Sequence, residues 1–281
     1  MKKLIYLIPV VLGLLVNTGC KKDSDFLSEI PESFYTIENA FSTSQQVDQV
    51  LISIYSHIRD LWANTTETGW IFNLRGNGTD LFDVASIRRG NSFNNYGSIN
   101  ADNGTFYEVY STWYYVINRA NLALYAAELP QIQWGSDAEK KYAIAQARFF
   151  RAFAYRNLGE LFGGVPIVTD ISKTPQFDFE RPGRVETYQF AIADLESIEN
   201  DLPEATAEGG RLVRAAAQHN LCELYLAMGI QLKAEGKDGE ATTAFTKAVG
   251  FANKVIDGGR YSLIKSRYGS RRNEAMISFP V

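Results

Sequence analysis

The sequence predicts an all-α fold of antiparallel helical hairpins, and three observations support this. Apolar residues recur at helical spacing over six separate segments, each about five to seven turns long. Capping residues precede two of these segments, at Thr43 and Ser136, and glycine or proline follows most of the six. Finally, 46% of the 281 residues are hydrophobic and 21% are charged, which supplies a large core without making the chain membrane-embedded.

The central element is a helix predicted over residues 137–162. Ser136 and Glu139 form a capping box, because the hydroxyl and the carboxylate can each accept from a free amide at a helix start. At the other end, Gly163 and Gly164 can adopt the left-handed turn that closes a helix, and Pro166 cannot continue it. Apolar side chains cover most of the circumference in between, so we expect this helix to be buried on several sides.

Three arginines, Arg148, Arg151 and Arg156, lie inside this apolar helix. A guanidinium taken out of water must find carboxylate or carbonyl partners, so we expect partners on neighbouring helices. The alternative is that these arginines bind an anionic ligand. It is the weaker hypothesis, because no phosphate-binding loop is nearby.

The other five helices are predicted at 43–62, 106–129, 184–202, 214–232 and 240–257. We expect three antiparallel pairs: 43–62 with 106–129, 137–162 with 184–202, and 214–232 with 240–257. In the last pair Ala241, Phe245 and Ala248 have the small-large-small spacing of the second helix of a tetratricopeptide repeat. Such spacing lets two helices approach closely. Stacked pairs then bury the apolar surface that a single pair leaves exposed.

The N-terminus has the pattern of a secretory signal. Lys2 and Lys3 precede thirteen apolar residues, too few to span a bilayer, and Gly19-Cys20 follows. We therefore expect residues 1–19 to be a lipoprotein signal peptide, Cys20 to be the lipid attachment site, and residues 20–42 to be a leader from the anchor. The alternative is an ordinary signal peptide with an incidental cysteine. Export leaves Cys222 unpaired, and we expect it to be buried.

A long polar segment, residues 63–105, separates the first two helices and is a candidate ligand-binding region. It holds six glycines and eight asparagines, with aromatic residues among them, and residues 70–74 alternate enough for a short strand. Aromatic rings stack on the CH faces of sugars, while amide and charged side chains form hydrogen bonds with the sugar hydroxyls. The candidate ligand-binding residues are Trp70, Asn73, Arg75, Asp80, Phe82 and Tyr96. The alternative is that the aromatic side chains cap the helices beneath.

Composition limits the chemistry of the chain. A net charge of −4 and a pI near 5.4 argue against nucleic acid as a partner. Two cysteines and two histidines, all far apart, give no zinc site, and we expect no metal or cofactor. We assign no catalytic residue. His57 is expected to be packed or half-exposed, and His219 with Glu223 a solvated pair.

The run ARFFRAFAYRNLGELFGGVPIV, residues 147–168, resembles the signature helix of the SusD/RagB family, surface lipoproteins with which Bacteroidetes capture glycans and other nutrients. It departs from the family pattern at Arg156, usually Phe, and at Gly164, commonly Asp. Further segments resemble the family in the right order: Trp113 to Asn121, Arg181 to Pro203, Gly210 to Leu226, and Gly259 to Leu263.

The resemblance implies a scaffold of tetratricopeptide-like units, residues 43–281 here, anchored in the outer membrane through Cys20. It also implies non-catalytic binding of oligosaccharides or other nutrients at the cell surface, and delivery to a TonB-dependent SusC-type transporter on which the protein sits as a lid. Family members are roughly twice as long, so we expect a truncated or fragmentary member lacking the C-terminal half, with apolar faces exposed.

Two alternatives remain open for the function. One is a tetratricopeptide-type adaptor that binds protein segments at the outer membrane. The other is a glycoside hydrolase, which requires two carboxylates, for which Asp80 and Asp83 are available.

Overall fold

The computed structural model describes residues 39–63, 74, 76, 78–80, 96, 99–100, 102–171 and 176–263. The chain divides into two compact units, residues 1–41 and residues 42–281, and every helix below belongs to the second. The described elements are α2 (Ser44–Ala63), α5 (Gly104–Ala127), α6 (Asp137–Phe162), α7 (Arg184–Ile198), η2 (Glu199–Asp201), α8 (Arg214–Ala234) and α9 (Asp238–Asp257). The all-α prediction is confirmed.

The predicted caps explain where α2 and α6 begin. The Gln46 side chain accepts from the amides of Ser42 and Thr43 at 2.7 and 3.0 Å, ahead of α2. Ser136 Oγ accepts from the amide of Glu139 at 3.1 Å. The Glu139 carboxylate accepts from the amide of Gly135 at 2.8 Å, one residue earlier than in a standard capping box.

The C-terminus of α6 also follows its sequence signal. Gly163 has a φ of +79°, in the left-handed region where glycine is favoured, and its amide bonds back to Gly159 O at 3.2 Å. The chain therefore leaves α6 at the residue that the glycine pair predicted.

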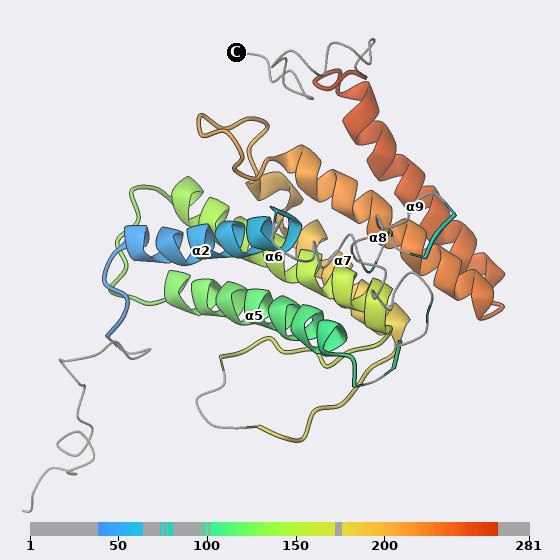
Figure 1. Ribbon diagram of the computed structural model, residues 1–281. Coiled ribbons are helices and arrows are strands. Elements are labelled where there is room, and N and C mark those ends of the chain that lie inside the picture. Colours follow the sequence, from blue (N-terminus) through green and yellow to red (C-terminus); the bar gives the residue numbers. More distant parts are fainter. Residues whose placement is uncertain are drawn as a thin grey trace, which may run out of the picture. The chain divides into compact units, whose positions relative to one another are not determined.

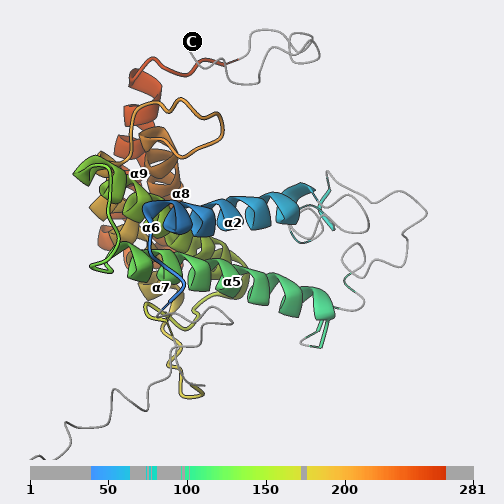
Figure 2. The ribbon, with the colours of Figure 1, turned by 90° about the vertical axis from the view of Figure 1, so that its left-hand side faces the viewer.

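The helices pack as three antiparallel pairs (Figure 1): α2 with α5, α6 with α7, and α8 with α9. Successive pairs are joined through contacts between α5 and α6 and between α7 and α8. The α8–α9 contact is the most extensive, and Phe245 packs against Gly229 there, as the small-large-small spacing predicts. The C-terminal end of α2 and the N-terminal end of α5 lie together on one side of the bundle (Figure 2).

The core centres on α6, which contacts α2, α5, α7, η2 and α8. Its three arginines, of which Arg151 and Arg156 are buried and Arg148 is half-buried, find partners on neighbouring helices, which confirms that prediction. Arg151 is held by Asp194 of α7 and Asn121 of α5. Arg156 is held by Glu160 on its own helix and by residues of α8, and Arg148 donates to Ser197 of α7 at 2.7 Å.

Two expectations need correction. Cys222 is half-buried rather than buried, and burial together with the nearby Glu223 raises the pKa of its thiol. Leu74, the one described residue of the segment expected to be a strand, lies in a helical turn. The remainder of that segment, residues 70–73, lies outside the described residues.

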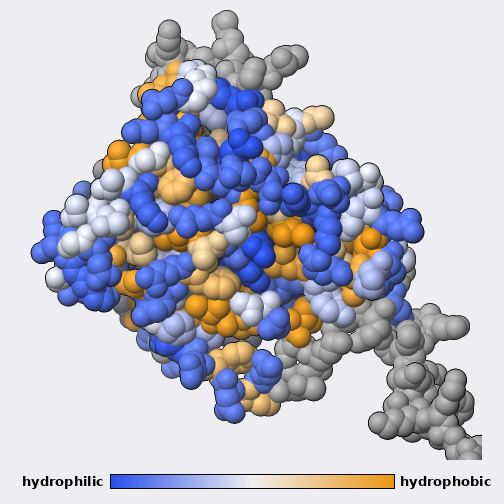
Figure 3. Space-filling model, turned by 180° about the vertical axis from the view of Figure 1, so that it is seen from behind, coloured by the Kyte–Doolittle hydropathy of each residue, from blue (hydrophilic) through white to orange (hydrophobic). Residues whose placement is uncertain are grey.

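No helix in the described ranges is both long and apolar enough to cross a bilayer. The face seen in Figure 3 carries separate apolar patches between hydrophilic residues. Exposed apolar side chains include Leu226 and Ile230 of α8 and Val249 and Ile256 of α9.

Candidate functional site

A shallow, open pocket of about 490 Å³ lies where the segment between α2 and α5 joins α5; we name it the Tyr107 pocket. Its walls come from the end of that segment, the first turns of α5 and the last turn of α6. The lining residues are Asn100, Phe106, Tyr107, Tyr110, Leu161 and Phe162.

Local backbone signals position this pocket. The Asn103 side chain accepts from the amide of Thr105 at 3.0 Å and so starts α5 two residues before the predicted start. Asn100 Oδ1 accepts from the amide of Asp102 at 3.0 Å, which fixes the turn leading into the helix. From this start, helical spacing places Tyr107 and Tyr110 on one side of the first turns of α5.

The aromatic rings of the pocket form a partly open cluster. Tyr110 packs edge-on against Phe162, with ring centroids 5.2 Å apart, and lies 4.9 Å from the ring of Tyr114. Tyr114 is anchored by donating to Pro166 O at 2.6 Å, and burial raises the pKa of its hydroxyl. Tyr107 is 75% exposed, so its ring face is available to a ligand. An exposed ring beside an amide side chain, Asn100, suits a sugar ring with its apolar face and hydroxyl edge.

Only two of the six ligand-binding residues predicted from the sequence fall in the part of the chain that the structure describes. Asp80 and Tyr96 are described, and both are exposed. The other four, Trp70, Asn73, Arg75 and Phe82, lie outside the described residues, as do Asp83 and Cys20.

The structure brings Tyr96 against the turn that leads to Asp80. Thr79 closes this turn by bonding to Gly76 O through its side chain at 2.8 Å, and the Tyr96 hydroxyl donates to Gly78 O. Tyr96 has a φ of +57°, uncommon for a residue other than glycine, and is 62% exposed. It is therefore held by its hydroxyl with its ring largely in solvent.

Sequence reasoning missed Tyr107 and Asn100 as candidate ligand contacts. Tyr107 lies off the buried stripe of α5, which contains Val109, Trp113 and Val116. An aromatic residue off the apolar stripe, directly after an asparagine-rich segment, was the signal that could have identified it.

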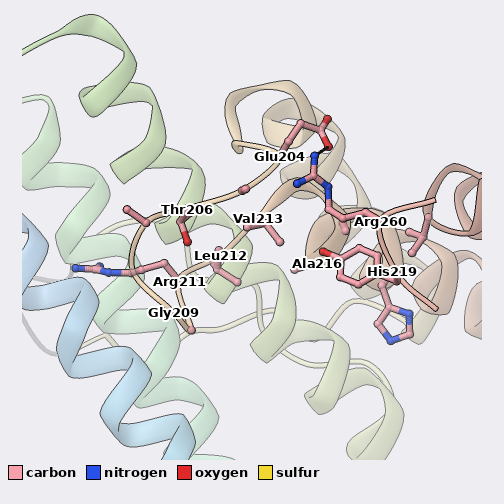
Figure 4. Close-up of a pocket in the computed structure, with 15 residues that line it drawn as sticks. Glu204, Thr206, Gly209, Arg211, Leu212, Val213, Ala216, His219 and Arg260 are labelled. Atoms are coloured by element: carbon pink, nitrogen blue, oxygen red, sulfur yellow. Dashed lines mark ion pairs between the residues drawn. The ribbon is translucent and has the colours of Figure 1, made fainter. Parts of the chain in front are cut away.

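A second cavity, about 620 Å³ in volume, lies between the connection after α7, the start of α8 and the segment after α9 (Figure 4). Its wall is mostly apolar, and an ion pair joins Glu204 and Arg260 at 3.7 Å. His219 lies at this cavity, 3.3 Å from Glu223, but Glu223 also pairs with Arg156. The side chains of His219 and Glu223 are both partly exposed to solvent, in line with the expected solvated pair.

Neither histidine suggests catalysis. The ring of His57 packs 4.4 Å from that of Tyr115, which confirms the packed interpretation. Among the residues that the structure describes, no group of three or more histidine, cysteine, aspartate or glutamate side chains is arranged to hold a metal ion.

The SusD-like family model, described as "Starch-binding associating with outer membrane", matches residues 25–226. The chain belongs to the SusD-like family. The recognition made from the sequence is confirmed.

Known proteins support this membership. This SusD-like chain is 30% identical over 238 residues to SusD-like protein P2 of Formosa agariphila, covering 82% of this chain and 44% of that protein. It is 32% identical over 152 residues to the starch-binding protein SusD of Bacteroides thetaiotaomicron, covering 54% of this chain and 25% of that protein. A solved laminarin-binding SusD-like protein shares the fold, with a TM-score of 0.60 and 22% identity, over 82% of this chain and 46% of that one. The chain thus spans less than half the length of these relatives.

Proposed function

We propose that this SusD-like chain belongs to a non-catalytic glycan-binding lipoprotein of the outer membrane, which delivers its ligand to a TonB-dependent SusC-type transporter. The observation that carries the proposal is the Tyr107 pocket, with an exposed aromatic ring and an amide at the edge of the aromatic-rich segment. The relatives add support, because one is named as binding starch and another as binding laminarin. In this proposal the ligand also contacts Trp70, Asn73, Arg75, Asp80, Phe82 and Tyr96.

Replacing Tyr107 tests the glycan site. Burying an aromatic ring against a ligand contributes about 1.5–3 kcal/mol, so Tyr107→Ala should weaken affinity for a bound oligosaccharide about tenfold or more. Isothermal titration with maltoheptaose and laminariheptaose measures this. Phe177→Ala is the matched control, because Phe177 is 87% exposed and lines neither cavity described above. Equal affinities for wild type and Tyr107→Ala would remove the pocket from the proposed site.

The lipid anchor is tested separately from ligand binding. Cells expressing the chain with its own N-terminus should incorporate radiolabelled palmitate, and Cys20→Ala should abolish the incorporation. Labelling that persists in Cys20→Ala would refute Cys20 as the attachment site. A chain that is never labelled would refute the anchor.

Association with the transporter is tested by co-purification. Affinity-tagged chain should co-purify a SusC-type outer-membrane barrel from detergent-solubilised membranes of its native cells.

The test for catalysis follows the ligand itself. Bound oligosaccharides should be recovered intact after long incubation. Cleavage that is lost in Asp80→Ala or Asp83→Ala would instead support the glycoside hydrolase.

A further inference from the structure

A third cavity, about 420 Å³ in volume, lies at the opposite end of α2 from the aromatic-rich segment; we name it the Trp134 pocket. Its walls come from the start of α2, the α5–α6 connection, the first turns of α6 and the connection before α8. The side chains that matter here are Asp48, Trp134, Glu139, Tyr142, Glu208 and Arg211. Helix α6 lines both pockets, with Tyr142 here and Leu161 in the Tyr107 pocket, and the 19 residues of helix between them rise about 30 Å at 1.5 Å per residue.

Arg211 organises this pocket without being free to bind a ligand itself. It donates to both carboxylate oxygens of Asp48 at 2.8 Å and to Glu208 at 2.6 Å, and its guanidinium lies 5.6 Å from the centre of the Tyr55 ring. These bonds, above all those to Asp48, raise the pKa of the guanidinium. Figure 4 shows Arg211 pointing away from the apolar cavity and toward α2. The planar guanidinium of Arg211 therefore fixes the orientation of the Asp48 and Glu208 carboxylates.

Beside the hydroxyl and amide groups of Ser44 and Gln45, the pocket offers a ligand carboxylate acceptors and aromatic faces. A carboxylate offers about four lone pairs, so Asp48 and Glu208 keep acceptor capacity beyond Arg211, and Glu139 keeps capacity beyond its bond to Gly135. Tyr142 donates its hydroxyl to Leu212 O at 3.0 Å, which fixes its ring in the wall.

Trp134 supplies the second aromatic group of the pocket. Its indole Nε1 is buried and has no hydrogen-bond acceptor among the described residues. The indole Nε1 of Trp113 in the core also has no acceptor, so it is the position of Trp134 in the pocket wall that makes its ring and N–H candidate contacts for a bound molecule.

The charge of the lining selects among ligand classes. Three carboxylates, on Asp48, Glu139 and Glu208, line the pocket with one guanidinium, on Arg211, so the charge of the lining is net negative. A sulfated or uronic-acid sugar would be repelled. A neutral sugar has hydroxyl donors for the carboxylates and a CH face for the rings.

We propose that the Trp134 pocket is a second carbohydrate site, which holds one or two residues of a neutral glycan separately from the Tyr107 pocket. This inference rests on the proposed glycan-binding function and extends it. Two sites about 30 Å apart would let one chain hold a polysaccharide at two points, so the residence of a long glycan would exceed that of a short one.

The tryptophan side chains supply a test that distinguishes the two sites. The chain contains four tryptophans, Trp62, Trp70, Trp113 and Trp134, each with one indole N–H signal in a ¹H–¹⁵N spectrum. Trp134→Phe identifies the signal of Trp134 by its loss. Trp113 is fully buried and serves as the internal reference.

The titration uses neutral maltoheptaose, laminariheptaose, cellohexaose and xylohexaose, with anionic tetragalacturonate as the comparator. We expect a sugar that binds in calorimetry to shift the Trp134 signal and leave the Trp113 signal in place. The Trp134 shift should persist in Tyr107→Ala, because the two sites are separate.

Three outcomes overturn the inference in distinguishable ways. A neutral sugar that binds in calorimetry while the Trp134 signal stays in place refutes the second site and leaves the proposed function standing. A Trp134 shift with tetragalacturonate alone refutes the neutral ligand class. Absence of calorimetric binding by all four neutral sugars refutes the proposed function, and the second site with it.

Discussion

The side chain of Arg151 shows how a charge is accommodated in the core. Arg151 is 7% exposed; Asp194 receives two of its bonds, at 2.7 and 2.8 Å, and Asn121 receives a third at 2.8 Å. Removing one member of a buried pair leaves the other charge uncompensated. We therefore predict that Arg151→Met lowers the free energy of unfolding by about 3–5 kcal/mol, measured by urea denaturation.

An exposed pair on α2 provides the control for this prediction. Arg59 and Asp60 are 3.4 Å apart, with side chains 71% and 64% exposed, so Arg59→Met should change stability by less than about 1 kcal/mol. The double variant Arg151→Met with Asp194→Leu should recover part of the loss, because no buried charge remains. A single variant as stable as wild type would show that Asp194 is solvated.

His57 predicts a pH dependence of stability. Burial lowers the pKa of its imidazole, with Asp60 opposing this effect and Arg119 adding to it, and its Nε2 is buried without an acceptor among the described residues. A folded-state pKa below the unfolded value of about 6.5 means that the unfolded chain binds the proton first. Stability is therefore fully present above about pH 6.5 and decreases as the pH falls toward the folded-state pKa.

The measurement compares wild type with His57→Phe by urea denaturation between about pH 7.5 and 5, the range that brackets the unfolded pKa. The variant should lose less stability over this window, because the phenyl ring keeps the contact with Tyr115 and takes up no proton. Parallel stability curves would show that His57 does not contribute to the pH dependence.

At the scale of the elements, the turn after α6 depends on a close backbone approach. A Cβ at Gly164 would lie 1.8 Å from Pro182 O, a main-chain atom of the connection before α7. Arg181 secures the same turn by donating to Gly164 O at 2.6 Å and to Phe162 O at 2.9 Å. No side chain fits there without moving the backbone.

We predict that Gly164→Ala lowers the free energy of unfolding by about 1–3 kcal/mol, because overpacking forces backbone shifts. Gly250→Ala is the matched control. Gly250 is exposed on α9, and a Cβ added there would meet nothing within 4 Å, so alanine should stabilise the helix by up to about 1 kcal/mol. Thermal unfolding of both variants measures the contrast, and changes of the same sign would contradict it.

Local signals explain why the helices were predictable. Ser136 and Gly163 delimit α6 as predicted, because a cap and a left-handed glycine act within one turn. The burial of Cys222 depends on packing between helices, which no local signal reports, and there the prediction was wrong. Cys222 is half-buried, because the burial of a helix position depends on how other elements pack around it and not on the residue type alone.

The candidate site was less predictable than the helices. The aromatic-rich segment indicated a binding region, and Tyr96 is exposed within it. The Tyr107 and Trp134 pockets each combine residues from segments far apart in the chain, and spacing along a sequence does not determine such juxtapositions. Arg211 and Asp48, 163 positions apart, are the clearest case.

At the scale of the whole helical unit, packing follows chain order. Each pair contacts its neighbour, and α6 alone among the described helices reaches α2, α5, α7 and α8. In such stacked arrays stability is the sum of local terms and nearest-neighbour interfaces. An element with one interface therefore opens at a lower free energy than an element with several.

This arrangement predicts an order of opening. Among the described helices α9 has its substantial contact with α8 alone, whereas α6 is covered on several sides. Native-state hydrogen exchange should therefore show α9 amides exchanging through a partial opening, at a free energy below that of the α6 amides, which should exchange only by global unfolding. Phe245→Ala, which removes the ring packed on Gly229, should lower the opening energy of α9 and leave the difference between α5 and α6 unchanged. Equal protection of α9 and α6, both decreasing together in Phe245→Ala, would show that the hairpins unfold as one cooperative unit.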